Sequence, residues 1–193
     1  MDEEIGEGIG EEEGVTNSLR ILSLYGDIEE EKCSEIISGL RILHHSFTNG
    51  TDEGDREQFE LLVSSAGGSA SDMFAIYDTM RMVREDCDIK TRGLGKVMSA
   101  AVLLLAAGTK GKRLVGKNCR LMIHSVVSGH AGELYSLQNE LEEVQWVQNQ
   151  YVKALANETD MTQKYIKKLL NRRVNVYLTA EEAVEHGIAD EVF

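Results

Sequence analysis

The sequence predicts an α/β fold in which parallel strands are connected by crossover helices. Short apolar stretches typical of buried strands alternate with longer stretches in which apolar residues recur at helical spacing. The chain has 193 residues and is 42% hydrophobic, which suits one domain with a sizeable core and argues against disorder. We therefore expect a single domain over residues 16–193, preceded by a tail over residues 1–15.

The first half of the domain supplies most of this alternation. Strands are expected at 19–25, 59–63 and 89–93. Helices are expected at 29–44 and 71–84, and a third helix begins at Ser99 and continues into the apolar stretch 103–108. The tail before these elements mixes acidic residues with glycine and has little to bury, so we expect it to be mobile.

The second half adds a short strand and a long helix. The strand covers residues 121–125 and includes His124. The helix covers about residues 133–155 and has apolar residues on one face, namely Leu134, Leu137, Leu141, Val144, Tyr151 and Leu155. This face fits either packing against the chain's own core or an interface with another copy of the chain.

Ser99 is the candidate nucleophile, because the first turn of a helix presents free backbone N–H groups to an oxyanion. The alternative for a serine at a helix start is a capping role. His124 is the residue type best suited to accept a proton from Ser99 near neutral pH. The pair Gly67-Gly68 follows an apolar strand and permits backbone angles that turn N–H groups into a cleft.

Composition excludes several functions. With 33 acidic and 20 basic residues the formal net charge is −13, which disfavours nonspecific binding to nucleic acid or to an anionic membrane. No apolar run is long enough to cross a bilayer, and the amino terminus does not have the pattern of a signal peptide. We therefore expect a cytoplasmic protein with neither a nucleic-acid nor a membrane partner.

The sequence shows no pattern for a metal or a cofactor. The three cysteines, at positions 33, 87 and 119, lie far apart, so we interpret them as reduced, packed thiols. The segment 108–113 is rich in glycine and basic residues, but it does not have the spacing of a phosphate-binding loop. We interpret it as a basic turn that could face a ring of subunits.

Several of these segments resemble the proteolytic subunit of the Clp protease, in the order found in that family. The matching segments are Ala66-Gly67-Gly68-Ser69, the helix 75–80, Gly95 with Ser99 four residues later, 107–113, Met122-Ile123-His124 and 178–184. The resemblance covers about residues 18–193. It implies a ClpP/crotonase-like spiral of repeated β-β-α units with a protruding handle helix, the handle region being about 130–165.

The resemblance also assigns the site. It places the nucleophile at Ser99, the general base at His124 and the oxyanion donors at the backbone N–H groups of Gly68 and Ala100. The third member of the triad, normally aspartate, falls at Asn175, which can orient the imidazole but supplies no charge. Asn175 therefore predicts weak or conditional activity.

The function implied is that of a serine endopeptidase subunit in a self-compartmentalising protease. Family members form a tetradecamer of two stacked heptameric rings and take unfolded proteins from an ATP-dependent AAA+ unfoldase, with no cofactor of their own. The residues before the first strand do not match the family's axial segment, so the resemblance does not extend to docking of the unfoldase.

Three alternatives stay open at this point. One is a weakly active or inactive structural subunit of such a ring, favoured by Asn175. Another is a processing protease of the phage type. The last is an acyl-CoA enzyme, because the crotonase superfamily shares the spiral architecture and the double-glycine oxyanion hole.

Overall fold

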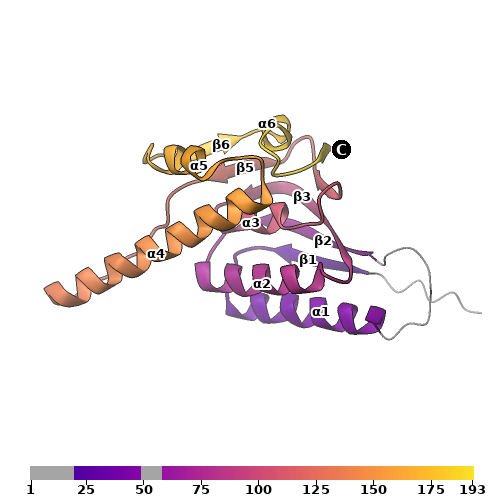
Figure 1. The fold of residues 1–193 in the computed structure, drawn as a ribbon, viewed down its shortest axis with the longest axis horizontal. Coiled ribbons are helices and arrows are strands. Elements are labelled where there is room, and N and C mark those ends of the chain that lie inside the picture. Colours follow the sequence, from indigo (N-terminus) through magenta and orange to yellow (C-terminus); the bar gives the residue numbers. More distant parts are fainter. Residues whose placement is uncertain (1–19, 49–57) are drawn as a thin grey trace, which may run out of the picture.

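The computed structural model describes residues 20–48 and 58–193, which form one seven-stranded sheet and six helices (Figure 1). The strands are β1 (Ile21–Tyr25), β2 (Gln58–Ser65), β3 (Asp88–Met98), β4 (Arg113–Val115), β5 (Arg120–Ile123), β6 (Val176–Leu178) and β7 (Glu191–Val192). The helices are α1 (Glu30–Thr48), α2 (Ala70–Val83), α3 (Ala100–Ala106), α4 (Leu134–Glu158), α5 (Gln163–Leu170) and α6 (Ala180–Glu185). The expected mobile tail, and the boundary expected after residue 15, lie outside the described residues.

The sheet is built mainly from parallel pairs, as the alternation of elements predicts. Its strands run in the order β1-β2-β3-β4-β7, and each neighbouring pair is parallel. β5 pairs in parallel with β3, while β6 pairs antiparallel with β5. α1 and α2 pack against each other on one side of the strands (Figure 1). The α/β prediction is therefore confirmed, with β6 as the antiparallel exception.

β3 is longer than expected and changes its partner along its length. Residues 91–93 pair with β4, whereas residues 96–98 pair with β5. Between these two stretches β3 contains two more residues than β2, because Val63 pairs with Gly93 and Ser65 with Val97. The bulge diverts the strand toward β5. Residues 95–98 consequently extend the strand beyond its expected end at residue 93, so the nucleophile candidate lies directly between a strand and a helix.

The core lies between the sheet and its helices. Every residue of α3 is buried, which explains its unbroken apolar sequence. In α5 the apolar side chains of Ile166, Leu169 and Leu170 are buried, and the buried face of α2 includes Ile76 and Met80. None of the helices among the described residues is long and apolar enough to cross a membrane.

α4 projects away from the rest of the molecule (Figure 1). Only its carboxyl-terminal part is packed, through Tyr151, Val152, Ala154, Leu155 and Glu158. Its amino-terminal part leaves large apolar side chains exposed, namely Leu134, Tyr135, Leu137, Leu141 and Trp146. The end of α4 therefore packs on the chain's own core, as one of the two interpretations expects, whereas an interface with another copy of the chain stays a prediction for its exposed beginning.

The expected basic turn at 108–113 ends in a buried arginine. Arg113 is 4% exposed, and its guanidinium donates to both carboxylate oxygens of Asp190 and to the main-chain oxygens of Glu158 and Gly187. Partial burial acts to raise the pKa of Asp190, but the hydrogen bonds and the positive charge of Arg113 hold it below its ordinary value. Arg113 thus fastens β4 to the carboxyl-terminal segment and does not face solvent.

Candidate active site

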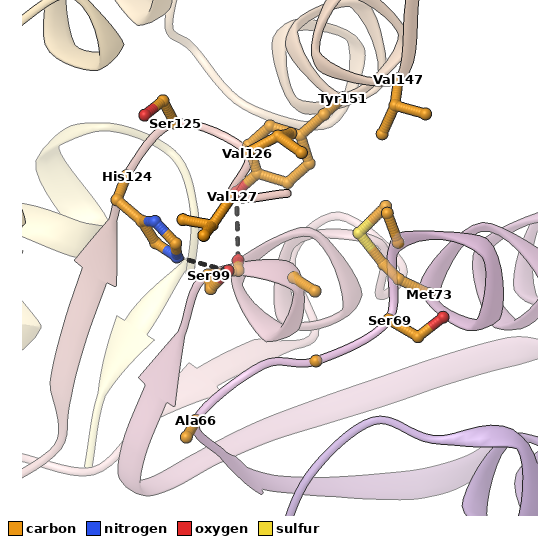
Figure 2. Close-up of a pocket in the computed structure, with 13 residues that line it drawn as sticks. Ala66, Ser69, Met73, Ser99, His124, Ser125, Val126, Val127, Val147 and Tyr151 are labelled. Carbon is orange, nitrogen blue, oxygen red and sulfur yellow. Dashed lines mark hydrogen bonds between the residues drawn. The ribbon is translucent and has the colours of Figure 1, made fainter. Parts of the chain in front are cut away.

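A pocket of about 370 Å³ lies where β3 ends and α3 begins. Figure 2 shows Ser99 and His124 on one side of this pocket and Met73, Val147 and Tyr151 on the other. The remaining lining residues are Ala66, Gly68, Ser69, Ala70, Ala100, Ser125, Val126 and Val127. Its size is that of a small-ligand site, and its wall combines apolar side chains with a few polar groups.

Ser99 occupies an unusual backbone conformation. Its φ of 55° and ψ of −123° lie outside the regions that non-glycine residues normally adopt, and they arise because β3 turns directly into α3 at this residue. The Ser99 N–H donates to the carbonyl oxygen of Met122 on β5, at 2.7 Å. Although Ser99 stands at the N-cap position, its hydroxyl makes no capping hydrogen bond. The capping alternative is therefore wrong, and Oγ is turned into the pocket.

His124 meets this hydroxyl. It is the first residue after β5, and its Nε2 lies 2.8 Å from Ser99 Oγ (Figure 2). In the tautomer that carries its proton on Nδ1, Nε2 accepts the hydroxyl proton. The parallel pairing of β5 with residues 96–98 of β3 brings the two strand ends to the same edge of the sheet, so the two side chains meet.

The double glycine shapes the opposite wall. Gly67 O accepts from Ile28 N–H, and Ser69 N–H donates to Ile28 O, both at 2.8 Å. These bonds flank Gly68, so its own N–H and C=O point away from Ile28. Among the residues that the structure describes, neither the Gly68 N–H nor the Ala100 N–H has a hydrogen-bond partner. Both residues line the pocket, and two free amides there could receive a negative oxygen.

Asn175 lies close to His124 along the sheet but makes no hydrogen bond with it. Ile123 pairs with Val176, so continuing this antiparallel register would set Asn175 opposite His124. The Asn175 side chain is exposed, and it has no hydrogen-bond partner in the described parts of the chain. His124 likewise has no partner there besides Ser99. The structure thus brings Ser99 and His124 together, but Asn175 does not hydrogen-bond the imidazole ring of His124 and so does not orient it.

Two α4 residues that hold the backbone at or beside the pocket were missed at the level of sequence. Tyr151 donates its hydroxyl to the carbonyl oxygen of Ser99 at 3.2 Å. Gln148 Oε1 accepts from the backbone N–H of Val126 at 3.2 Å and so ties the segment after His124 to α4. In the sequence, Tyr151 is one member of an apolar helical face; its polar atom is the only signal, since a buried tyrosine hydroxyl usually finds a partner.

Groups of three or more histidine, cysteine or acidic residues that could hold a metal ion are absent from residues 20–48 and 58–193. The arrangement at the pocket instead suits acyl transfer. A hydroxyl hydrogen-bonded to an imidazole can attack a carbonyl carbon, and two nearby amides can stabilise the oxyanion that forms. Fold and site together define a hydrolase of the serine type.

Comparison with known proteins identifies the family. The family model for Clp protease matches residues 12–193. The chain is 37% identical over 175 residues to ATP-dependent Clp protease proteolytic subunit 1 of Corynebacterium glutamicum, which covers 90% of this chain and 79% of that protein. It is 36% identical over 174 residues to proteolytic subunit 1 of Thermobifida fusca, covering 90% of this chain and 73% of the relative. This chain therefore belongs to the Clp protease family.

Proposed function

We propose that this protein is a serine endopeptidase subunit of the ClpP type, with Ser99 as nucleophile and His124 as general base. The 2.8 Å hydrogen bond between Ser99 Oγ and His124 Nε2, inside a pocket that also exposes two free amides, carries the proposal. Membership of the Clp protease family supports it. In this proposal the backbone N–H groups of Gly68 and Ala100 donate hydrogen bonds to the oxyanion. Asn175 approaches His124 only when the imidazole of His124 becomes protonated.

The reaction follows from these positions. Nε2 of His124 accepts the Ser99 proton while Oγ attacks the peptide carbonyl carbon. The resulting oxyanion accepts hydrogen bonds from the N–H groups of Gly68 and Ala100. The imidazolium then protonates the leaving amine, and water hydrolyses the acyl-enzyme by the reverse sequence of proton transfers. Because asparagine stands at position 175, where the triad normally has an aspartate, no carboxylate of the triad neutralises the imidazolium, and we expect each proton transfer to be slower than in an Asp-containing triad.

The assembly is a second part of the proposal. The exposed apolar side chains at the beginning of α4 fit a contact between copies of this chain, and the relatives carry names of ATP-dependent Clp protease subunits. We propose two stacked heptameric rings that receive unfolded proteins from an AAA+ unfoldase and form a chamber around the pockets. The cytosolic location expected from the sequence stays a prediction.

The test is covalent labelling of the intact oligomer with a fluorophosphonate, measured by intact mass spectrometry after native mass measurement of the assembly. We expect one label per subunit in the wild type and none in Ser99→Ala or His124→Ala. Ser125→Ala is the matched control, because Ser125 lines the same pocket beside His124 and has no hydrogen bond in the described structure. Labelling that persists in Ser99→Ala would refute the assignment of the nucleophile.

One observation favours a second function, that of a structural subunit in a ring with an active paralogue. Asn175 makes no hydrogen bond with His124 in the described structure, so the base lacks the partner that normally orients it. Well-formed rings that resist labelling at Ser99 would support this alternative. No contact in the pocket favours the acyl-CoA reaction, and none selects a phage-type processing role over general proteolysis.

A further inference from the structure

Tyr151 reaches from α4 into the centre of the active site. Its side chain is 7% exposed, and its hydroxyl donates to the carbonyl oxygen of Ser99 at 3.2 Å (Figure 2). The same oxygen accepts the N–H of Val102 at 3.1 Å. The hydroxyl therefore adds a second hydrogen bond to an oxygen that already belongs to the first turn of α3, and this second bond comes from a different helix.

The carbonyl of Ser99 is covalently linked to a proposed oxyanion donor. Ser99 C=O and Ala100 N–H belong to one peptide group, which is planar and trans. The C=O and N–H bonds of such a group point in opposite directions. A hydrogen bond that fixes the direction of the Ser99 oxygen therefore also fixes the direction of the Ala100 N–H.

The backbone at this peptide needs support. A serine at φ 55° is held in a sparsely populated conformation, which costs on the order of 1–3 kcal/mol and persists only where the surroundings impose it. On the amino-terminal side, the Ser99 N–H is held by Met122 O at 2.7 Å. On the carboxyl-terminal side, the Ser99 carbonyl oxygen accepts a hydrogen bond from outside α3, and its donor is the Tyr151 hydroxyl. The two bonds clamp Ser99 between β5 and α4.

We propose that Tyr151 is a positioning residue, whose hydroxyl holds the Ser99–Ala100 peptide so that the Ala100 N–H faces the oxyanion, and which thereby links the position of α4 to the rate of acylation. This inference rests on the proposed peptidase function. It also gives α4 a second role, since the helix whose beginning exposes apolar side chains carries Tyr151 near its buried end. Burial raises the pKa of Tyr151 above its ordinary value, so the phenol stays a neutral donor over the pH range of peptidase assays.

The test compares Tyr151→Phe with two matched controls that each remove one tyrosine hydroxyl. Tyr77→Phe removes a buried hydroxyl, which donates to Glu158 Oε1 at 2.9 Å and lies outside the pocket. Tyr165→Phe removes a hydroxyl from a partly exposed tyrosine on α5, outside the pocket. For each protein we would measure kcat and KM with a fluorogenic peptide, and the inhibition constant of a peptide aldehyde, whose adduct with Ser99 places an oxyanion near Ala100.

Removing one oxyanion donor outright typically lowers kcat by a factor of 10² to 10³, and misdirecting it costs less. We therefore expect Tyr151→Phe to lower kcat about tenfold with KM unchanged, and to weaken aldehyde binding by about the same factor. Replacing Tyr151 with 4-aminophenylalanine, which restores a neutral N–H donor, should recover most of the rate. Tyr77→Phe and Tyr165→Phe should leave kcat and aldehyde binding unchanged.

Two results would overturn the inference while the peptidase function stands. One is a wild-type kcat in Tyr151→Phe, and the other is an equal loss of kcat in Tyr77→Phe, which would indicate general destabilisation. If Tyr151→Phe fails to assemble, the 4-aminophenylalanine variant decides: an assembled variant with a tenfold loss contradicts the positioning role. Wild-type rings without Ser99-dependent labelling would refute the proposed function first, and the inference with it.

Discussion

Gly68 is the position where one added methyl group should do the most damage. A Cβ on Gly68 would lie 2.2 Å from the carbonyl oxygen and 2.7 Å from the nitrogen of Ile28. Both atoms are main-chain atoms, held by 2.8 Å hydrogen bonds to the residues on either side of Gly68, so neither can swing aside as a side chain would. Gly68→Ala must therefore push the 66–69 segment away from Ile28, which lies between β1 and α1, and toward the pocket.

The expected cost has two parts. A non-glycine residue at φ +151° costs on the order of 1–3 kcal/mol, and overpacking against fixed atoms adds about 1–3 kcal/mol. A loss of about 4 kcal/mol in the free energy of unfolding corresponds to a fall of about 8–16 °C in the melting midpoint of a chain of this size. Because Gly68 N–H is also a proposed oxyanion donor, we expect peptidase activity to fall at temperatures where the variant is still folded.

Gly26→Ala is the matched control for the steric part. Gly26 also has a positive φ, +88°, but no atom lies within 4 Å of the position its Cβ would take. This variant should show only the dihedral cost, about 1–2 kcal/mol, with unchanged kcat. Thermal unfolding followed by circular dichroism measures both variants at the same protein concentration. If Gly68→Ala melts no lower than Gly26→Ala, the reasoning that Ile28 is immovable is wrong.

Three other predictions concern single side chains. Asn175→Asp should raise kcat with a fluorogenic peptide by about tenfold, because a carboxylate would stabilise the imidazolium of His124; an unchanged or lower kcat would contradict this. Glu158→Gln should lower the free energy of unfolding by about 3 kcal/mol, because it removes the buried carboxylate that forms an ion pair with Arg84; denaturant titration measures the loss, with the exposed Glu143→Gln as control. Asp190 has a folded-state pKa below its ordinary value, so its carboxylate stabilises the fold above the unfolded-state pKa and loses this effect as pH falls through the folded-state pKa. Asp190→Asn should accordingly be less stable than wild type at neutral pH, and the difference should shrink in acid, which melting curves over an acid-to-neutral series would test.

The order of strands and helices could be predicted because each element carries its own pattern. α3 is apolar throughout since all its residues are buried, and the expected strand at 59–63 lies inside β2. The boundaries of β3 could not be predicted in the same way. Its second half contains Gly95 and Lys96, which look like a turn, and it is a strand only because β5 pairs with it. Such pairing between distant segments leaves little trace in local sequence.

For the site, the sequence indicated which residues to consider but not how they are held. The approach of His124 to Ser99 depends on two strand ends that are separated in the chain and adjacent in the sheet. The positive φ of Ser99 could not be predicted, because serine rarely adopts it without tertiary support. Tyr151 lies among the apolar residues of α4, and the sequence does not show whether its hydroxyl faces water or donates to a buried carbonyl.

The backbone of Ser99 also bears on how such a chain evolves. A glycine at position 99 would adopt φ 55° without penalty, and would at the same time remove the hydroxyl on which the proposed chemistry depends. Selection for a sturdier fold and selection for turnover therefore act in opposite directions at this one position. In a lineage that kept the oligomeric ring but lost the reaction, glycine at position 99 would carry no cost. Continued selection for the hydroxyl would instead preserve serine at this position.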